Sequence, residues 1–253
     1  NDFYEQNRYD LSLYYYNKGL LYGRADDKIY NRIGNLYYLF EQYPEALSNY
    51  SKAVKLNEAV EEYRINYGRA LIKTNRDKEA IELLEKIVDG DTKDVDLLAD
   101  YSTIWLKKKD YQKGLEYLNK AYLIDPNSST VLIKLGKALI DTDQLDEGKE
   151  KLLQAASSIS KTDPAGAAII LKYSVDKKAD TRSVKALAKL LFDKREYREV
   201  YELIKRSRVS MFLDEELVGL LLETEIELGL LSIALTEVNN IEKKDLSAKL
   251  SYL

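Results

Sequence analysis

The chain has 253 residues, a formal net charge of −4, 45% hydrophobic and 32% charged residues, and neither cysteine nor histidine. This composition is that of a folded protein, and it excludes disulfides, thiolate nucleophiles, imidazole bases and zinc sites built on Cys or His. The acidic balance disfavours phosphate backbones, so no nucleic-acid partner is expected. The sequence contains no run of about 18 apolar residues, so no membrane span is expected either.

A repeat with a period of about 34 residues organises most of the sequence. Small residues recur once per period inside apolar, helix-like stretches, at Gly34, Gly68, Ser102 and Gly136. Twelve residues after each lies a second small residue: Ala46, Ala80, Gly114 and Gly148. Each period therefore predicts two amphipathic helices, with small residues where the two backbones approach closely.

Turn signals fall between the predicted helices. Pro44 lies at the expected start of a second helix, where its missing N–H is tolerated, and Asp125-Pro126-Asn127 ends another helix at the end of a period. No segment shows the alternation typical of a strand, so an all-α fold is predicted.

The segment from Tyr30 to Ala53 carries a further pattern, with Tyr30, Ile33, Gly34, Tyr37, Ala46, Tyr50 and Ala53 in fixed spacing. It resembles the tetratricopeptide repeat family, whose first helix has an aromatic residue, Leu-Gly and Tyr, and whose second helix has Ala, an aromatic residue and Ala. The resemblance implies a right-handed superhelical solenoid of antiparallel helix pairs with a concave groove, and it implies adaptor roles.

The phase of the repeat predicts the domain organisation. Residues 1–26 would form a partial first repeat, mainly its second helix, which favours a truncated or processed N-terminus. Residues 27–160 would form four regular repeats. The phase breaks after Ser160 and resumes at Ala188, which follows Gly136 by one period and about half of another. We therefore expect an irregular segment over 161–180 with one extra helix near 164–175, two further repeats over 181–245, and the start of a capping helix over 246–253.

The concave groove is expected to be lined by the first helix of each pair. The candidate peptide-binding residues, which combine amides, cations and hydroxyls, are Asn31, Asn35, Tyr38, Asn66, Arg69, Lys73, Thr103, Lys107 and Lys137, with Ile65, Ile133 and Ile140 as apolar neighbours. The amides could bind an extended peptide backbone and the cations could bind acidic side chains. The alternative for any single residue is a solvated helix face.

Within the same family, some members grip a carboxylate with two Asn and three cations. Asn35 and Asn66 match the two asparagine positions of that clamp. Asn31, Asp96 and Asp100 occupy the cationic positions, and two carboxylates there would repel an anionic guest. The resemblance therefore does not extend to a carboxylate clamp.

Three functions remain open from the sequence. The first is a non-catalytic scaffold that binds a protein or peptide in its groove. The second is a structural assembly or spacer component of a larger complex, which associates through its edges and convex face and could self-associate through its exposed ends. The third is a helical-repeat RNA binder, which the net charge disfavours. No phosphate-binding loop, dinucleotide motif or nucleophile elbow occurs, so neither enzymatic activity nor a cofactor or metal is expected. Without cysteine the compartment is open: the chain would be soluble, in the cytoplasm or, after removal of a signal peptide, in the periplasm.

Overall fold

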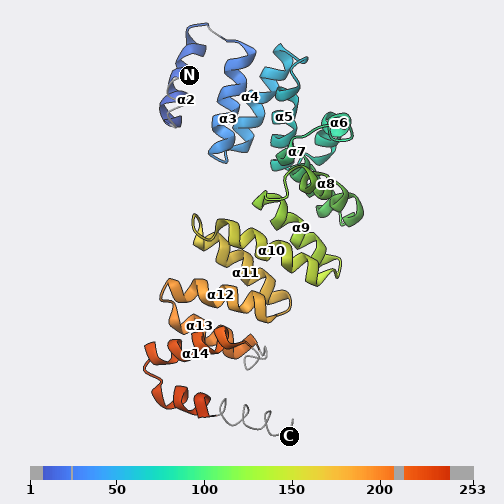
Figure 1. The fold of residues 1–253 in the computed structure, drawn as a ribbon. Coiled ribbons are helices and arrows are strands. Elements are labelled where there is room, and N and C mark those ends of the chain that lie inside the picture. Colours follow the sequence, from blue (N-terminus) through green and yellow to red (C-terminus); the bar gives the residue numbers. More distant parts are fainter. Residues whose placement is uncertain (1–7, 24, 208–213, 240–253) are drawn as a thin grey trace. The chain divides into compact units, whose positions relative to one another are not determined.

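The computed structural model describes residues 8–23, 25–207 and 214–239, and every regular element in these ranges is an α-helix (Figure 1). The chain divides into two compact units, residues 1–124 and 125–253. The first unit contains α2 (Tyr9–Leu21), α3 (Asp27–Leu39), α4 (Tyr43–Leu56), α5 (Glu61–Lys73), α6 (Asp77–Val88), α7 (Val95–Lys107) and α8 (Tyr111–Ile124). The second contains α9 (Ser129–Asp141), α10 (Leu145–Ile159), α11 (Pro164–Lys177), α12 (Thr181–Asp193), α13 (Tyr197–Ser207) and α14 (Glu215–Glu227), and residues 231–239 are also helical.

Helices follow one another in packed pairs within each unit. In the first unit α3 packs on α4, α5 on α6 and α7 on α8, while in the second unit α9 packs on α10 and α12 on α13. The second helix of a pair also contacts the first helix of the following pair: α4 contacts α5, and α6 contacts α7. The predicted all-α class of stacked helix pairs is therefore confirmed.

The small residues of the repeat lie where paired helices touch. A Cβ atom on Gly34 of α3 would lie 2.5 Å from Cε1 of Tyr50 on α4, and one on Gly68 of α5 would lie 2.5 Å from Cγ of Leu84 on α6. A Cβ on Gly136 would lie 2.7 Å from the backbone oxygen of Gly148. The regular spacing of small residues thus follows from close helix crossings, which leave no room for a side chain.

The turn inside each helix pair has one residue in the left-handed conformation. The residues with positive φ at these turns are Glu41, Asn75, Lys109, Asp143, Arg195 and Gly229. The first four follow one another at intervals of one period, as do the last two. At each turn the next backbone N–H bonds to the carbonyl five residues earlier, for example Arg76 to Leu71 at 2.9 Å. This bond satisfies a carbonyl left free at the helix end and fixes the backbone of the turn.

The start of several helices is fixed by side-chain caps. Asp26, Asp94, Ser128, Asp163, Asp180 and Asp214 each accept a hydrogen bond from the backbone N–H three residues later. Such caps satisfy an N–H that has no partner within the helix.

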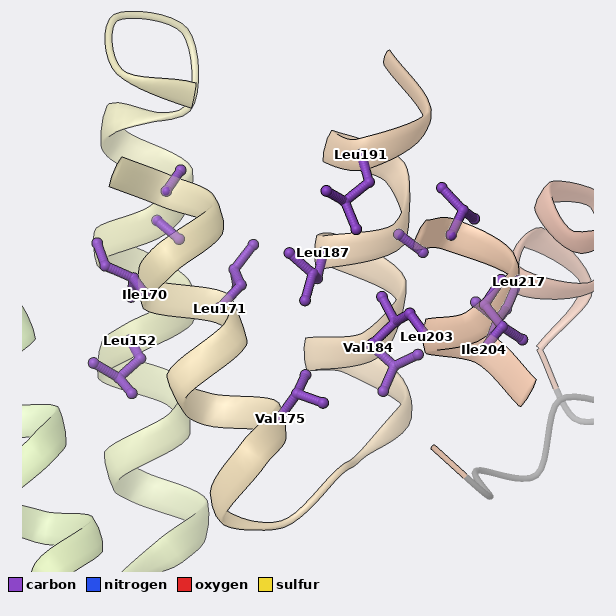
Figure 2. Close-up of a cluster of buried hydrophobic side chains, with 14 of the residues drawn as sticks. Leu152, Ile170, Leu171, Val175, Val184, Leu187, Leu191, Leu203, Ile204 and Leu217 are labelled. Atoms are coloured by element: carbon purple, nitrogen blue, oxygen red, sulfur yellow. The ribbon is translucent and has the colours of Figure 1, made fainter. Parts of the chain in front are cut away.

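The second unit contains the predicted extra helix. Helix α11 begins at Pro164 and extends to Lys177, and it packs against α10 and α12. Figure 2 shows Leu171 and Val175 on α11 facing Leu187 and Val184 on α12, within one apolar cluster that continues to α13 and α14. The extra helix is therefore part of the core of this unit.

Polar contacts fix the C-terminal end of this insertion. The buried Lys149 of α10 donates from Nζ to the Lys178 backbone oxygen at 2.6 Å and lies 3.0 Å from Oδ2 of Asp180. The hydroxyls of Ser174 and Ser183 share a buried hydrogen bond of 3.0 Å between α11 and α12. These bonds join α10, α11 and α12 around the connection before α12.

Glu225 of α14, where the family pattern has an aromatic residue, is fully buried. Its Oε1 lies 3.3 Å from Nζ of Lys205 on α13, which also bonds to Glu237 at 2.8 Å. An ion pair therefore takes the place of an aromatic contact in the last pair. The predicted start of the first repeat before residue 8 and the predicted capping helix over 246–253 lie outside the described residues.

Candidate peptide-binding groove

Eight of the nine candidate residues lie on the first helices of the first unit. Asn31, Asn35 and Tyr38 are on α3, Asn66, Arg69 and Lys73 on α5, and Thr103 and Lys107 on α7. Lys137 is on α9 in the second unit, together with Ile133 and Ile140. The structure therefore brings the residues of α3 and α5 together as one site.

A chain of amide hydrogen bonds crosses from α3 to α5. Asn66 Nδ2 donates to Oδ1 of Asn31 at 3.0 Å and to Oδ1 of Asn35 at 3.4 Å. The Tyr50 hydroxyl donates to the same Asn35 oxygen at 2.8 Å, and Asn31 Nδ2 donates to Glu62 at 3.1 Å. Asn31 is only 5% exposed and uses both ends of its amide within the chain. Its role is therefore to join two repeats, which differs from the expected contact with a guest.

Two polar groups of this amide network can still form hydrogen bonds with a ligand. Asn35 bonds through its oxygen and Asn66 through its nitrogen, which leaves the Asn35 NH2 and the Asn66 oxygen without a hydrogen bond among the described residues. Both side chains are only partly buried. A donor and an acceptor therefore remain, the two groups that a peptide unit needs.

The cations beside the amides are neutralised by α7. Arg69 Nε donates to Oδ2 of Asp100 at 3.0 Å, Lys73 Nζ lies 3.5 Å from its Oδ1, and Asp96 lies 3.8 Å from Arg69. Asp100 is 6% exposed. Burial alone would lower the pKa of Arg69, but the neighbouring Asp100 carboxylate raises it. The expectation that these cations meet acidic side chains of a partner thus differs from the geometry, where they already have acidic partners.

Tyr38 lies against this ion pair. The Arg69 guanidinium stacks over its ring at 5.5 Å, and the ring of Tyr43 packs edge-on at 5.2 Å. Burial raises the pKa of Tyr38, and the charge of Asp100 adds to this effect while Arg69 opposes it. The buried hydroxyl has no acceptor of good hydrogen-bond geometry among the described residues. It is a neutral hydroxyl that is enclosed by the surrounding residues.

Together these residues form a cavity of about 230 Å³. It is lined by Asn35, Tyr38, Leu39, Tyr50, Asn66 and Arg69. Because Leu39 is half exposed beside the polar groups, the cavity combines an apolar contact with hydrogen-bonding groups.

Of the remaining candidate residues, some lie in the second unit and others already bond to neighbouring groups. Thr103 donates to the Ala99 carbonyl at 3.2 Å, and Lys107 donates to Asn75 at 2.8 Å. In the second unit Lys137 lies over the Tyr173 ring at 5.1 Å, and Ile140 is a core residue, which differs from its expected place in the groove. Ile65 and Ile133 are partly buried.

Sequence reasoning missed these contacts between neighbouring repeats, although their spacing carries a signal. Asn31 with Glu62, Asn35 with Asn66 and Arg69 with Asp100 are each 31 residues apart. That distance is about one helical turn less than the period, which puts the second residue beside the first on the adjacent first helix. A search for complementary residues at this spacing would have found the network.

Two further properties bear on function. The described residues contain no group of three or more acidic side chains that could hold a metal ion. None of the helices in the described part of the chain is both long and apolar enough to cross a membrane.

The fold and this site define an all-helical repeat scaffold, a kind of structure typical of protein–protein interaction. Residues 37–100 match the sequence profile of the tetratricopeptide repeat family. This segment of the chain therefore carries tetratricopeptide repeats, as the motifs predicted.

Solved structures of low sequence identity share the fold. The type IV pilus biogenesis factor PilW has a TM-score of 0.66 at 13% identity, with 80% of this chain and 93% of PilW covered. The C-terminal part of a TPR repeat-containing protein from Cytophaga hutchinsonii has a TM-score of 0.58 at 18% identity, covering 88% and 91%. MamA from Desulfovibrio magneticus RS-1 has a TM-score of 0.54 at 18% identity, covering 64% and 92%.

A curated relative shares part of the sequence. The human protein O-mannosyl-transferase TMTC1 is 28% identical over 127 residues, which are 49% of this chain and 14% of that protein. The chain thus spans about a seventh of the relative's length. This similarity covers only a limited stretch of sequence. Tetratricopeptide folds are generally non-catalytic scaffolds.

Proposed function

We propose that this protein is a non-catalytic scaffold that binds an extended segment of a partner protein along α3 and α5. The observation that carries the proposal is the cavity at Asn35, Tyr38 and Asn66, where hydrogen-bonding groups are held in place with capacity to spare. Its rigidity comes from the amide network, so little conformational entropy is lost when a guest binds.

The chemistry of the cavity suits a peptide backbone. The Asn35 NH2 can donate to a carbonyl oxygen, and the Asn66 oxygen can accept from a backbone N–H.

The guest does not need to be acidic. Arg69 and Lys73 already face Asp100, so the net charge that they offer to a ligand is small. We therefore expect selection by backbone hydrogen bonds and by an apolar side chain against Leu39, with weak dependence on salt.

The absence of catalysis is part of the proposal. The sequence has no Cys or His, and the carboxylates nearest the cavity, Glu62, Asp96 and Asp100, bond to neighbouring side chains. These carboxylates join one repeat to the next, which accounts for their presence without a role as acid or base. The human relative's transferase name is therefore not carried over to this chain.

Selection of peptides from a displayed library, followed by anisotropy titration of a selected peptide, tests the groove. Asn35→Ala and Asn66→Ala should each weaken binding about tenfold, corresponding to one or two lost hydrogen bonds. Asn127→Ala is the matched control, because Asn127 is exposed and does not line the cavity. Peptides that bind all three variants with equal affinity would refute the groove assignment.

A second candidate, a structural component of an assembly, is supported by α2. Tyr14, Leu21 and Tyr22 on and after this helix are 56%, 86% and 75% exposed. Tyr22→Ser and Leu21→Ser together should abolish any concentration-dependent association seen by sedimentation velocity. A monomer at all concentrations would count against this candidate and leave the first unaffected.

A further inference from the structure

Helix α11 is a single helix between two helix pairs. The pairs α9–α10 and α12–α13 each bring two helices together, whereas α11 packs on α10 and on α12. In a helix-pair array a second helix rests on its own first helix and on the next first helix, as α4 does on α3 and α5. Helix α11 contacts α10 and α12 in the same way, so it takes a second-helix position, and α12 lies between α11 and α13.

A groove of about 570 Å³ is lined by α11, α12 and α13. Its apolar floor comes from three helices: Ala168, Ile169 and Val175 of α11, Leu187 and Leu191 of α12, and Leu203 of α13. Ile169 is 70% exposed although it belongs to the same helix as the buried core residues. In Figure 2, Leu187 and Leu191 lie on the side of α12 that faces α11.

Charged side chains form the rim, and part of them is already paired. Lys194 lies 3.6 Å from Glu196, and Arg206 of α13 lies 4.0 Å from Asp176 of α11. These pairs close the ends of the groove without filling its floor.

The other rim charges have no ion pair in the described chain, and they differ between the two walls. Lys172 stands on the α11 wall, while Glu199 and Glu202 stand on the α13 wall beside Arg198. The free charge is thus positive on one wall and, on balance, negative on the other.

We infer that this groove binds an amphipathic α-helix of a partner protein, which lies along the apolar floor between the charged walls of α11 and α13. The guest helix would carry Ala and Leu at i, i+3, i+4 and i+7 toward the floor, with basic residues on the flank facing Glu199 and Glu202 and acidic residues on the flank facing Lys172. Small residues are expected opposite Ile169, because the helix pairs of this chain cross where small residues occur.

This surface is separate from the proposed peptide groove. All its residues lie in the second unit, whereas Asn35, Tyr38 and Asn66 lie in the first. It also binds a different ligand conformation. Its ligand is a folded helix with an apolar stripe, whereas the ligand of the first site is an extended backbone.

A synthetic helix tests the inference with the full chain. The probe is a labelled peptide of about 16 residues, long enough to be helical, with the Ala/Leu stripe, Lys on one flank and Glu on the other. One control peptide has the same composition with the stripe scrambled, and a second has the two charged flanks exchanged. Binding is measured by fluorescence anisotropy, and helicity by circular dichroism.

We expect saturable binding of the probe and at least tenfold weaker binding of both control peptides. Ala165→Trp, at an exposed position lining the groove, should fill it and reduce probe affinity at least tenfold while the helical spectrum of the protein stays unchanged. Glu202→Lys should weaken the probe and strengthen the exchanged-flank peptide. Glu227→Lys, the same charge change at an exposed site outside the groove, should alter neither.

Several results would overturn the inference: no saturable binding of the probe, equal affinity for the scrambled peptide, or unchanged affinity in folded Ala165→Trp protein. Self-association of the protein that Ala165→Trp abolishes would also overturn it, because a second copy would then be the occupant. Asn66→Ala should leave probe binding intact, so failure at one site is distinguishable from failure at the other.

Discussion

The carboxylate of Asp100 on α7 accepts a hydrogen bond from Nε of Arg69 on α5, at 3.0 Å. Asp100 is almost fully buried, whereas Asp96, one turn earlier on the same helix, is 61% exposed in its side chain and lies 3.8 Å from the same arginine. The two carboxylates therefore provide a matched comparison between a buried and an exposed contact with one cation.

Asp100→Ala should lower the free energy of unfolding by about 3 kcal/mol, because it leaves a partly buried guanidinium without its carboxylate. Asp96→Ala should change it by less than about 0.5 kcal/mol, since exposed pairs contribute little. Urea unfolding of the two variants measures the difference. Equal effects would mean that Asp100 does not hold α5 against α7.

Gly34→Ala should destabilise the first unit by about 1–3 kcal/mol, because the new methyl group would lie 2.5 Å from the Tyr50 ring. Gly219→Ala is the control, since no atom beyond its chain neighbours and its own helix backbone lies within 4 Å of a Cβ at this position. It should be neutral or stabilising by up to about 1 kcal/mol, as expected for Gly to Ala in a helix. Thermal melting distinguishes the two directions.

At the left-handed turns, glycine is expected to make the protein more stable than another residue does. Lys109 has φ of 61° and is exposed, so Lys109→Gly should relieve backbone strain and stabilise the protein by about 1 kcal/mol. Gly229 has φ of 74° at the equivalent turn, and Gly229→Ala should destabilise by a similar amount. Denaturant midpoints that shift in the same direction for both variants would contradict the assignment of these turns.

Asp180 should make stability depend on acid pH. Burial by itself would raise its pKa, but hydrogen bonds from Ser183 and the ammonium of Lys149 lower it below 3.8. The folded state therefore holds the proton less tightly than the unfolded state. The stability from this group is present above about pH 4 and is lost as pH falls through the lowered pKa.

Asp180→Asn should accordingly reduce stability at pH 7 by about 3 kcal/mol and flatten its fall between pH 4 and 2. Asp141→Asn is the control, because Asp141 and its partner Lys177 are both exposed at 3.5 Å. Chemical unfolding at a series of pH values gives both slopes. A parallel fall for wild type and Asp180→Asn would assign the acid sensitivity to other carboxylates.

The helix pairs could be predicted because the small residues and the buried stripe are specified by side-chain size. Gly34, Gly68 and Gly136 must be small for the helices to touch, so the period can be recognised in the amino-acid sequence. The turns have no comparable signature in the sequence. Glu41, Lys109 and Arg195 share a backbone conformation that glycine favours, yet none is glycine, because the hydrogen bond to the preceding helix end imposes it.

The candidate site was predictable only in part, for a similar reason. The position of Asn35 and Asn66 on neighbouring first helices follows from the period. Which of their atoms remain free does not, because it depends on Asn31 and Tyr50, whose hydrogen bonds cross between helices. The neutralisation of Arg69 by Asp100 likewise requires the register of two helices and is invisible in either segment alone.

The single helix α11 also changes the direction in which the second unit presents its helix ends. Short connections, residues 160–163 and 178–180, reverse the chain before and after α11. One added helix therefore reverses every helix that follows, so α12, which carries the small residue Ala188 of the period, runs opposite to α9. Helix dipoles carry partial positive charge at N-termini. Along the second unit, the electropositive ends of the first helices thus change from one edge of the stack to the other at α11, and a ligand that senses those ends would bind the two sides of the insertion in opposite orientations.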